Sequence, residues 1–286
     1  MRGRISVLAV AGALTVGVGV AGAVQFGVPD DGEHPYVGLM VAQTAEGAPL
    51  WRCTGTLISA NRFLTAGHCV GMEDPSGAGA PGHVEIWFDE QVVTDPNYTS
   101  VAAGGPGCAD AAVTGHPCHG EVGGDPVAHP GWNGLLTVPD QHDIGMVVLD
   151  EPVTDHGYGT LASEGTLDGL ATRRGLKNMS VGLVGYGLQG VKPVLSEEKS
   201  RLKATGTIVS LGSTFTYGFN VRISSGPGKG NGPGGTCFGD SGGPVFYEGE
   251  IVAVNSFLLN QNCKGSGYGY RTDTPWSFDF VDGFEP

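Results

Sequence analysis

Short apolar runs separated by turn residues are the feature that most limits the fold of this 286-residue chain. The runs are rich in β-branched and aromatic residues, and none keeps the helical period of about 3.6 residues except a short stretch after Pro275. The 51 glycines supply the tight turns that short strands need. The sequence therefore predicts an all-β protein, with strands at Tyr36–Ala42, Leu50–Ile58, Arg62–Ala66, Val84–Phe88, Ile144–Leu149, Ser180–Tyr186, Thr205–Ser210, Phe219–Ile223, Pro244–Tyr247, Ile251–Phe257 and Tyr268–Thr272.

Two stretches interrupt this pattern. Thr99–Pro130 is rich in Gly, Pro, Ala and His, and is predicted to be a surface excursion closed by its own disulfide. Ser224–Gly235 is predicted to be a second loop, rich in Gly and Pro.

The formal net charge is −14, which would repel phosphate groups over the whole surface. We therefore expect neither nucleic acid nor an anionic membrane as a partner, and we assign the acidity to solubility.

The N-terminus predicts export from the cell. Arg2 and Arg4 precede the uncharged stretch Ile5–Ala23, which ends in small residues suited to signal peptidase. We interpret residues 1–23 as a signal peptide, so the mature protein is expected to be secreted and free of the membrane. An uncleaved membrane anchor is the alternative, because the uncharged stretch is just long enough to span a bilayer.

Six cysteines in an exported protein are expected to pair. Proximity in the sequence suggests the disulfides Cys53–Cys69, Cys108–Cys118 and Cys237–Cys263. The alternative for one group is a zinc site made of Cys108, His116, Cys118 and His119. An oxidising compartment favours the disulfide, and we expect neither a metal nor a cofactor.

The most informative motif surrounds Ser241, in the segment Gly239–Pro244 with the sequence GDSGGP. Glycines beside a serine let the backbone approach a substrate carbonyl and free N–H groups for a developing oxyanion. The same letters fit the nucleophile turn of α/β-hydrolases, but those enzymes need a histidine after the serine, and the last histidine here is His156. The subtilisin order needs an acid before the base, and neither Asp30 nor Asp31 has suitable surroundings. The remaining order is His, Asp, Ser.

Two other motifs supply this order. His68 ends the sequence LTAGH and is followed by Cys69, whose predicted disulfide would hold the imidazole in place for proton transfer. Asp143 begins the apolar run DIGMVVL, where burial would strengthen its hydrogen bond to an imidazole. Either residue alone could be structural, as a buried histidine or a strand-capping aspartate. Together with Ser241 they indicate a catalytic triad.

LTAGHC, DIGMVVL and GDSGGP, in this order, resemble the chymotrypsin/trypsin family of serine proteases, here as a secreted, bacterial-type member. The resemblance runs from Val24 to about Asp273. It implies two six-stranded antiparallel β-barrels with the active site in the cleft between them. Residues 24–160 would form the first barrel, with His68 and Asp143, and residues 161–286 the second, with Ser241.

The resemblance also implies the role of each residue. Ser241 would be the nucleophile, His68 the general base and acid, and Asp143 the carboxylate that orients the imidazole. The N–H groups of Gly239 and Ser241 would form the oxyanion hole.

In this family a newly cut apolar N-terminus forms an ion pair with the acid that precedes the serine. That acid is Asp240 here, and Val24 follows the predicted cleavage site directly, so the resemblance implies a pair between the Val24 ammonium and Asp240. Gln25 and Phe26 depart from the residues that the family usually has at these positions.

The specificity pocket also departs from the trypsin pattern. Gly235, followed by Thr236, stands where trypsin-like members place an aspartate. The segment Ser256-Phe257-Leu258 resembles the pocket wall, with Ser256 also facing the catalytic acid and Leu258 narrowing the entrance. Without a carboxylate in the pocket, a Lys or Arg side chain has no partner charge, so we expect apolar or small side chains to be preferred.

These features predict a secreted serine endopeptidase that acts on polypeptides, is a monomer and has protein inhibitors as candidate partners. Two alternatives stay open. One is a catalytically weak or inactive binding protein with the same fold, and the other is a serine esterase that uses the same site.

Overall fold

The computed structural model describes residues 24–75, 77, 79–92, 119–171, 179–189, 191, 199–225 and 234–284. The predicted signal peptide at 1–23 lies outside these residues. So do both cysteines of the predicted Cys108–Cys118 disulfide, which also belong to the alternative zinc site.

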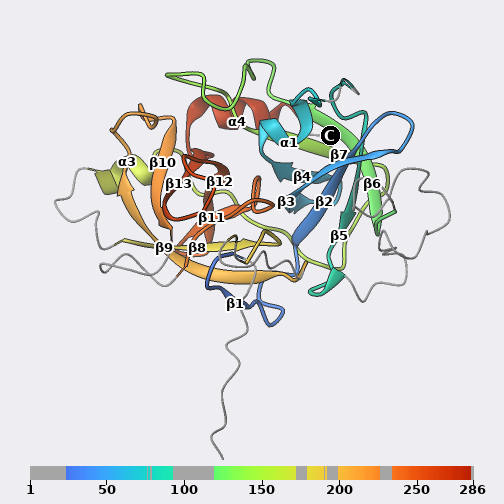
Figure 1. The fold of residues 1–286 in the computed structure, drawn as a ribbon, viewed down its shortest axis with the longest axis horizontal. Coiled ribbons are helices and arrows are strands. Elements are labelled where there is room, and N and C mark those ends of the chain that lie inside the picture. The colour runs from blue at the N-terminus through green and yellow to red at the C-terminus, as the bar shows by residue number, and fades with distance from the viewer. Residues whose placement is uncertain are drawn as a thin grey trace, which may run out of the picture.

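The first half of the chain forms a closed barrel of six antiparallel strands (Figure 1). Its strands are β2 (Val37–Gln43), β3 (Pro49–Ser59), β4 (Arg62–Thr65), β5 (His83–Trp87), β6 (Val122–Ala128) and β7 (Gly145–Leu149). They pair in the order β2-β3-β4-β7-β6-β5, and every pair is antiparallel.

The second half forms another ring of six antiparallel strands. Its strands are β8 (Ser180–Gly185), β9 (Leu202–Ser210), β10 (Asn220–Ser225), β11 (Pro244–Tyr247), β12 (Glu250–Leu258) and β13 (Gly265–Arg271). The order is β9-β10-β13-β12-β11-β8, and pairing of β8 with β9 closes the ring. The predicted all-β class with two six-stranded antiparallel barrels is confirmed.

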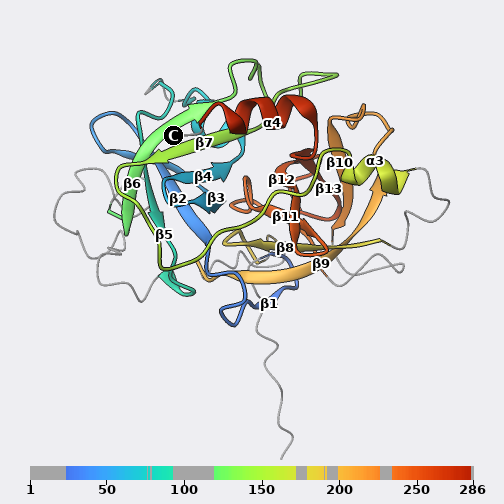
Figure 2. The ribbon, with the colours of Figure 1, turned by 180° about the vertical axis from the view of Figure 1, so that it is seen from behind.

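Few helices accompany the barrels. Those in the described parts of the chain are α1 (Gly67–Gly71), α3 (Thr166–Ala171) and α4 (Pro275–Asp282). The helix α4 begins where the sequence showed its helical stretch, and it lies beside β7 of the first barrel in both views (Figure 2).

Among the described residues, no helix is long and apolar enough to cross a membrane.

Each strand expected from an apolar run is present, with ends that differ by a few residues. The interpretation of Thr99–Pro130 as one surface excursion was wrong in its last part, because Val122–Ala128 is the barrel strand β6. This strand carries Gly123, Gly124 and Pro126 and has little apolar alternation. It forms because β5 and β7 supply hydrogen-bonding partners on both sides, and this long-range pairing overrides weak local propensity.

The chain before β2 crosses to the second barrel, because the short strand β1 (Val28–Pro29) pairs with β9. The division of the chain after residue 160 stays a prediction.

The seam between the barrels is apolar. One buried cluster joins Leu39 and Met146 of the first barrel to Val184 and Val254 of the second and to Phe280 of α4. Burial of apolar surface contributes about 25 cal/mol per Å², so this shared cluster stabilises the two barrels as one body.

A buried ion pair crosses the same seam. Arg201 donates from Nε to Asp30 Oδ2 over 3.0 Å, and from Nη1 to the carbonyl oxygens of Val37 and Phe88. Burial would raise the pKa of Asp30, but hydrogen bonds and charge from His34, together with Arg201, outweigh burial and lower it. Arg201 therefore links the segment before β2 to both barrels.

We expect Arg201→Met to destabilise the fold by about 3 kcal/mol, because the buried Asp30 carboxylate would lose its arginine and keep only His34 as a side-chain partner. Urea unfolding measures the loss, and Arg222→Met, which removes a half-buried arginine of β10, is the control. The deficit should shrink at acid pH, where Asp30 takes up a proton. A deficit no larger than that of the control would contradict this role.

Candidate active site

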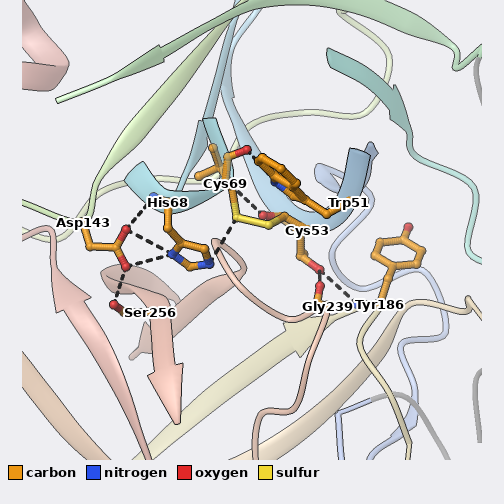
Figure 3. Close-up of a disulfide and its surroundings, with 10 residues drawn as sticks. Trp51, Cys53, His68, Cys69, Asp143, Tyr186, Gly239 and Ser256 are labelled. Atoms are coloured by element: carbon orange, nitrogen blue, oxygen red, sulfur yellow. Dashed lines mark hydrogen bonds and ion pairs between the residues drawn. A yellow bond between two sulfur atoms is a disulfide. The ribbon is translucent and has the colours of Figure 1, made fainter. Parts of the chain in front are cut away.

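His68 lies on α1, shortly after β4, and two links tie the next residue, Cys69, to β3. The disulfide Cys53–Cys69 joins β3 to the residue after His68, as predicted (Figure 3). Trp51 of β3 donates from its indole N–H to the carbonyl of Cys69 over 3.0 Å. These two links fix the backbone next to His68 relative to β3.

The carboxylate of Asp143 faces the His68 ring (Figure 3). His68 Nδ1 lies 3.1 Å from Oδ1 and 3.0 Å from Oδ2, and the backbone N–H of His68 donates to Oδ1 over 2.7 Å. Ser256 of β12 donates from its hydroxyl to Oδ2. Asp143 has no exposed surface, so donors from both barrels replace water around the carboxylate.

Ser241 lies in the turn before β11, and this turn is attached to the first barrel. Thr54 of β3 donates its N–H to the carbonyl of Ser241 over 2.8 Å. The next residue, Gly242, has φ of +78°, and a side chain there would collide with the hydroxyl of Thr65. Only glycine suits both the conformation and the space.

Ser241 and His68 line the same cavity, of about 220 Å³. Within the described part of the chain, no hydrogen bond joins the two side chains, and His68 Nε2 lies 3.6 Å from Cys69 Sγ. Catalytic hydrogen bonds are often long without substrate and tighten only in the reacting complex.

The turn that contains Ser241 presents free donors. Among the hydrogen bonds of the described residues, none uses the N–H of Gly239 or of Ser241. The carbonyl of Gly239 is turned toward β3, where it accepts a hydrogen bond of 2.8 Å from the Thr54 hydroxyl. Two unused N–H groups beside a serine can receive a developing negative charge.

The cavity wall contains four of the five residues predicted for the specificity pocket. The full lining is His68, Leu135, Thr236, Cys237, Phe238, Ser241, Asn255, Ser256, Phe257, Leu258 and Tyr268. Gly235 is not in this lining and instead pairs with Gln25 through its backbone. The disulfide Cys237–Cys263 is present as predicted.

Tyr268 and Leu135 line the cavity but were not expected from the sequence. Tyr268 of β13 stacks on its cross-strand partner Phe257, with ring centroids 4.6 Å apart and an interplanar angle of 7°. The alternating side chains of β13 indicate on which face of the strand Tyr268 lies. They do not indicate which strand pairs with β13, so the contact with Phe257 could not be predicted. Among the described lining residues there is no carboxylate.

The predicted partners Val24 and Asp240 are both fully buried. Val24 packs in the core of the second barrel, and the carboxylate of Asp240 accepts hydrogen bonds of 2.8 Å from the N–H groups of Gly187 and Cys237. Burial raises the pKa of Asp240 to about 7, against the two donors and the charge of Arg52. In the full chain the Val24 nitrogen belongs to a peptide bond, so the ion pair stays a prediction for the cleaved form.

Two groups of described residues have donor atoms close enough for a metal ion. In one, Cys53 and Cys69 flank His68, but their sulfurs are bonded to each other and offer no thiolates. In the other, Glu121 and Asp155 are exposed, and His156 already pairs with Glu121 over 2.7 Å. We propose neither as a metal site.

Known proteins are similar to this chain in sequence and in fold. The family model described as Trypsin matches residues 24–280. The chain belongs to the trypsin family. It is 29% identical over 245 residues to CLIP domain-containing serine protease B10 of Anopheles gambiae, covering 79% of this chain and 61% of that protein. It is 26% identical over 230 residues to Brachyurin of Leptuca pugilator, covering 77% of this chain and 80% of that protein.

Solved structures share the fold. An HL collagenase is similar with a TM-score of 0.59 and 17% identity, over 89% of this chain and 96% of that one. Human heparin binding protein is similar with a TM-score of 0.56 and 19% identity, over 90% and 92%. A scabies mite inactivated protease paralogue, S-D1, is similar with a TM-score of 0.57 and 16% identity, over 91% and 96%.

The two curated relatives come from a mosquito and a crab. They do not support the expectation of a bacterial-type member.

We expect cleavage before Val24 to stabilise the fold at alkaline pH. In the uncleaved chain the pKa of Asp240 is about 7, above the ordinary 3.8. Stability therefore falls as pH rises between these values, by about 4 kcal/mol in all. A Val24 ammonium would lower this pKa again. The cleaved chain should therefore be more stable than the uncleaved chain near about pH 8, and the two chains should have similar stability near about pH 4.

Urea unfolding across this pH range compares a chain that begins at Val24 with one that is extended before it. Parallel pH dependence of the two chains would contradict the ion pair.

Proposed function

We propose that this chain is a secreted serine endopeptidase that hydrolyses peptide bonds through an acyl-enzyme on Ser241. One observation carries the proposal: His68, with its Nδ1 held by Asp143, lines the same cavity as Ser241. The unused N–H groups of Gly239 and Ser241 support it.

In the proposed mechanism, Ser241 Oγ attacks the carbonyl carbon of the scissile bond while His68 Nε2 takes the hydroxyl proton. The carbonyl oxygen becomes an oxyanion and accepts hydrogen bonds from Gly239 and Ser241 N–H. His68 then donates the proton to the leaving amine, and the C–N bond breaks. Water repeats the sequence on the acyl-enzyme and releases the acid.

Asp143 holds one proton on Nδ1, which leaves Nε2 free to act as the base, and its charge stabilises the imidazolium that forms. The Ser256 hydroxyl and the His68 N–H fix this carboxylate from two directions. Because the carboxylate is fixed before substrate arrives, little reorganisation is needed during the reaction.

The cavity supports a preference for small or apolar side chains before the scissile bond. Phe257 and Tyr268 form an aromatic wall, and the described lining has no carboxylate. Burying a Lys or Arg head group there without a partner would cost several kcal/mol. We therefore propose that this enzyme is not Lys- or Arg-specific.

Secretion is part of the proposal, through a signal peptide at residues 1–23. The disulfides Cys53–Cys69 and Cys237–Cys263 suit an oxidising compartment. Polypeptides are the proposed substrates, protein inhibitors the proposed further partners, and a monomer the proposed state.

A second candidate is a binding protein with little or no turnover. The absence of a hydrogen bond between His68 and Ser241 in the described chain favours it, and a similar solved structure is named an inactivated protease paralogue. A serine esterase would use the same residues, and comparing turnover of matched ester and amide substrates separates the two activities.

We expect Ser241→Ala to lower peptidase turnover by roughly 10⁶-fold, because the nucleophile is lost. The fold should persist, since the side chain borders a cavity. A sulfonyl fluoride reagent should label the unaltered protein and not Ser241→Ala, with Ser180→Ala, an exposed serine of β8, as the control. Substantial peptidase activity in Ser241→Ala would refute the assignment.

We expect Tyr268→Ala to deepen the cavity and move the cleavage preference toward larger apolar side chains. Tyr268→Phe keeps the ring and should leave the preference unchanged, and Tyr158→Ala removes an exposed tyrosine as a control. Cleavage-site profiling on a denatured protein mixture measures the preference. An unaltered profile in folded Tyr268→Ala would mean that another residue limits the pocket.

A further inference from the structure

Arg52 of β3 lies beside the turn that carries Ser241. Its backbone pairs with Val41 of β2, and the next residue, Cys53, is bonded to Cys69 of α1. The arginine side chain is half buried. Its base is therefore a fixed part of the first barrel, while its head reaches the second.

The guanidinium fills the space beside Gly239 that a side chain there would need. A β-carbon built on Gly239 would lie 3.3 Å from Arg52 Nε and 3.6 Å from Nη2. Thr54, two residues further along β3, binds the carbonyl of the same glycine over 2.8 Å. Two side chains of one strand thus lie at Gly239, whose N–H we propose as an oxyanion donor.

Arg52 also acts on the adjacent Asp240. Burial raises the pKa of Asp240, and the positive charge of Arg52, together with the two backbone donors, opposes that rise. The carboxylate holds the turn through Gly187 N–H and Cys237 N–H, and these bonds are strongest when it is ionised.

We propose that Arg52 is a positioning residue for the oxyanion hole, which braces Gly239 and serves as an internal counter-charge for Asp240. The inference rests on the proposed function, because the Gly239 and Ser241 donors matter only if Ser241 reacts. Arg52 belongs to β3, so it acts before any cleavage at Val24. The uncleaved chain therefore keeps part of the ordered hole, and the Val24 ammonium adds to it.

The first experiment measures catalysis in Arg52→Met, Arg52→Lys and the control Arg62→Met. Arg62 is a half-buried arginine of β4 that donates to Ser59. Each variant is made in a chain that begins at Val24 and in an extended chain. Active sites are titrated with a fluorophosphonate, and kcat and KM are measured on a peptide amide.

Arg52→Met should lower kcat about tenfold to a hundredfold with little change in KM, because a mispositioned donor weakens the transition state more than the ground state. Affinity for a peptide boronic acid, which forms a tetrahedral adduct, should fall in parallel. Arg52→Lys should recover part of both, and the extended chain should lose its residual activity without Arg52. A kcat equal to that of Arg62→Met would overturn the proposal.

The second experiment needs no activity. In the Ser241→Ala background, urea unfolding is followed between about pH 5 and about pH 9. Removal of Arg52 should raise the pKa of Asp240 further. If the pKa rises by about one unit, the folding equilibrium constant of Arg52→Met should fall about tenfold more than that of Arg62→Met as pH rises across this range. Equal pH dependence of the two variants would overturn the counter-charge.

The two experiments separate the proposals. If the unaltered protein does not react with the fluorophosphonate while Arg52→Met shows the extra pH dependence, the proposed function fails and the contact between Arg52 and Asp240 stands.

Discussion

The arrangement of the site depends on the contacts that Thr54 of β3 makes with the turn of Ser241. Its N–H binds the Ser241 carbonyl, and its hydroxyl binds the Gly239 carbonyl, each over 2.8 Å. The preceding residue, Cys53, is bonded to the residue that follows His68. One short stretch of the first barrel therefore sets the position of both the histidine and the serine turn of the second barrel. One of these links is a backbone hydrogen bond and one is a covalent bond, so only the Thr54 hydroxyl bond depends on a polar side chain.

In the described part of the chain, each fully buried carboxylate has hydrogen-bond donors that replace water. Asp30 is bonded to Arg201, Asp273 accepts two hydrogen bonds from Arg271, and Asp143 faces His68. Asp240 differs from these, because its hydrogen-bond donors are backbone N–H groups. A carboxylate held in this way is incompletely compensated, which is why burial raises its pKa to about 7. An added positive charge would therefore favour its ionised form.

The sequence was sufficient for most strands, because alternating apolar residues and turn glycines mark a half-buried strand locally. It failed for β6, where Gly123, Gly124 and Pro126 hide a strand that neighbouring strands stabilise. The pairing of Asp143 with His68 and the Ser256 contact followed from motifs in order. Tyr268 and Arg52 could not be found in this way, because their positions depend on which distant residues lie opposite them, and a lone aromatic or basic residue in a strand carries no such information.

In our proposals two positive charges, Arg52 and the Val24 ammonium, act on the Asp240 carboxylate, and each contributes to ordering the turn of Ser241. If Arg52 contributes one pKa unit, the ionised form of Asp240 is favoured about tenfold before any cleavage, and the ammonium of Val24 adds only the remainder. Maturation would then increase activity by degrees and would not act as a strict switch. This fits the proposed maturation, in which the cut that removes the signal peptide also creates Val24. When release and activation are one event, no inactive secreted form exists. An oxyanion hole that is fully disordered before cleavage would then have no function.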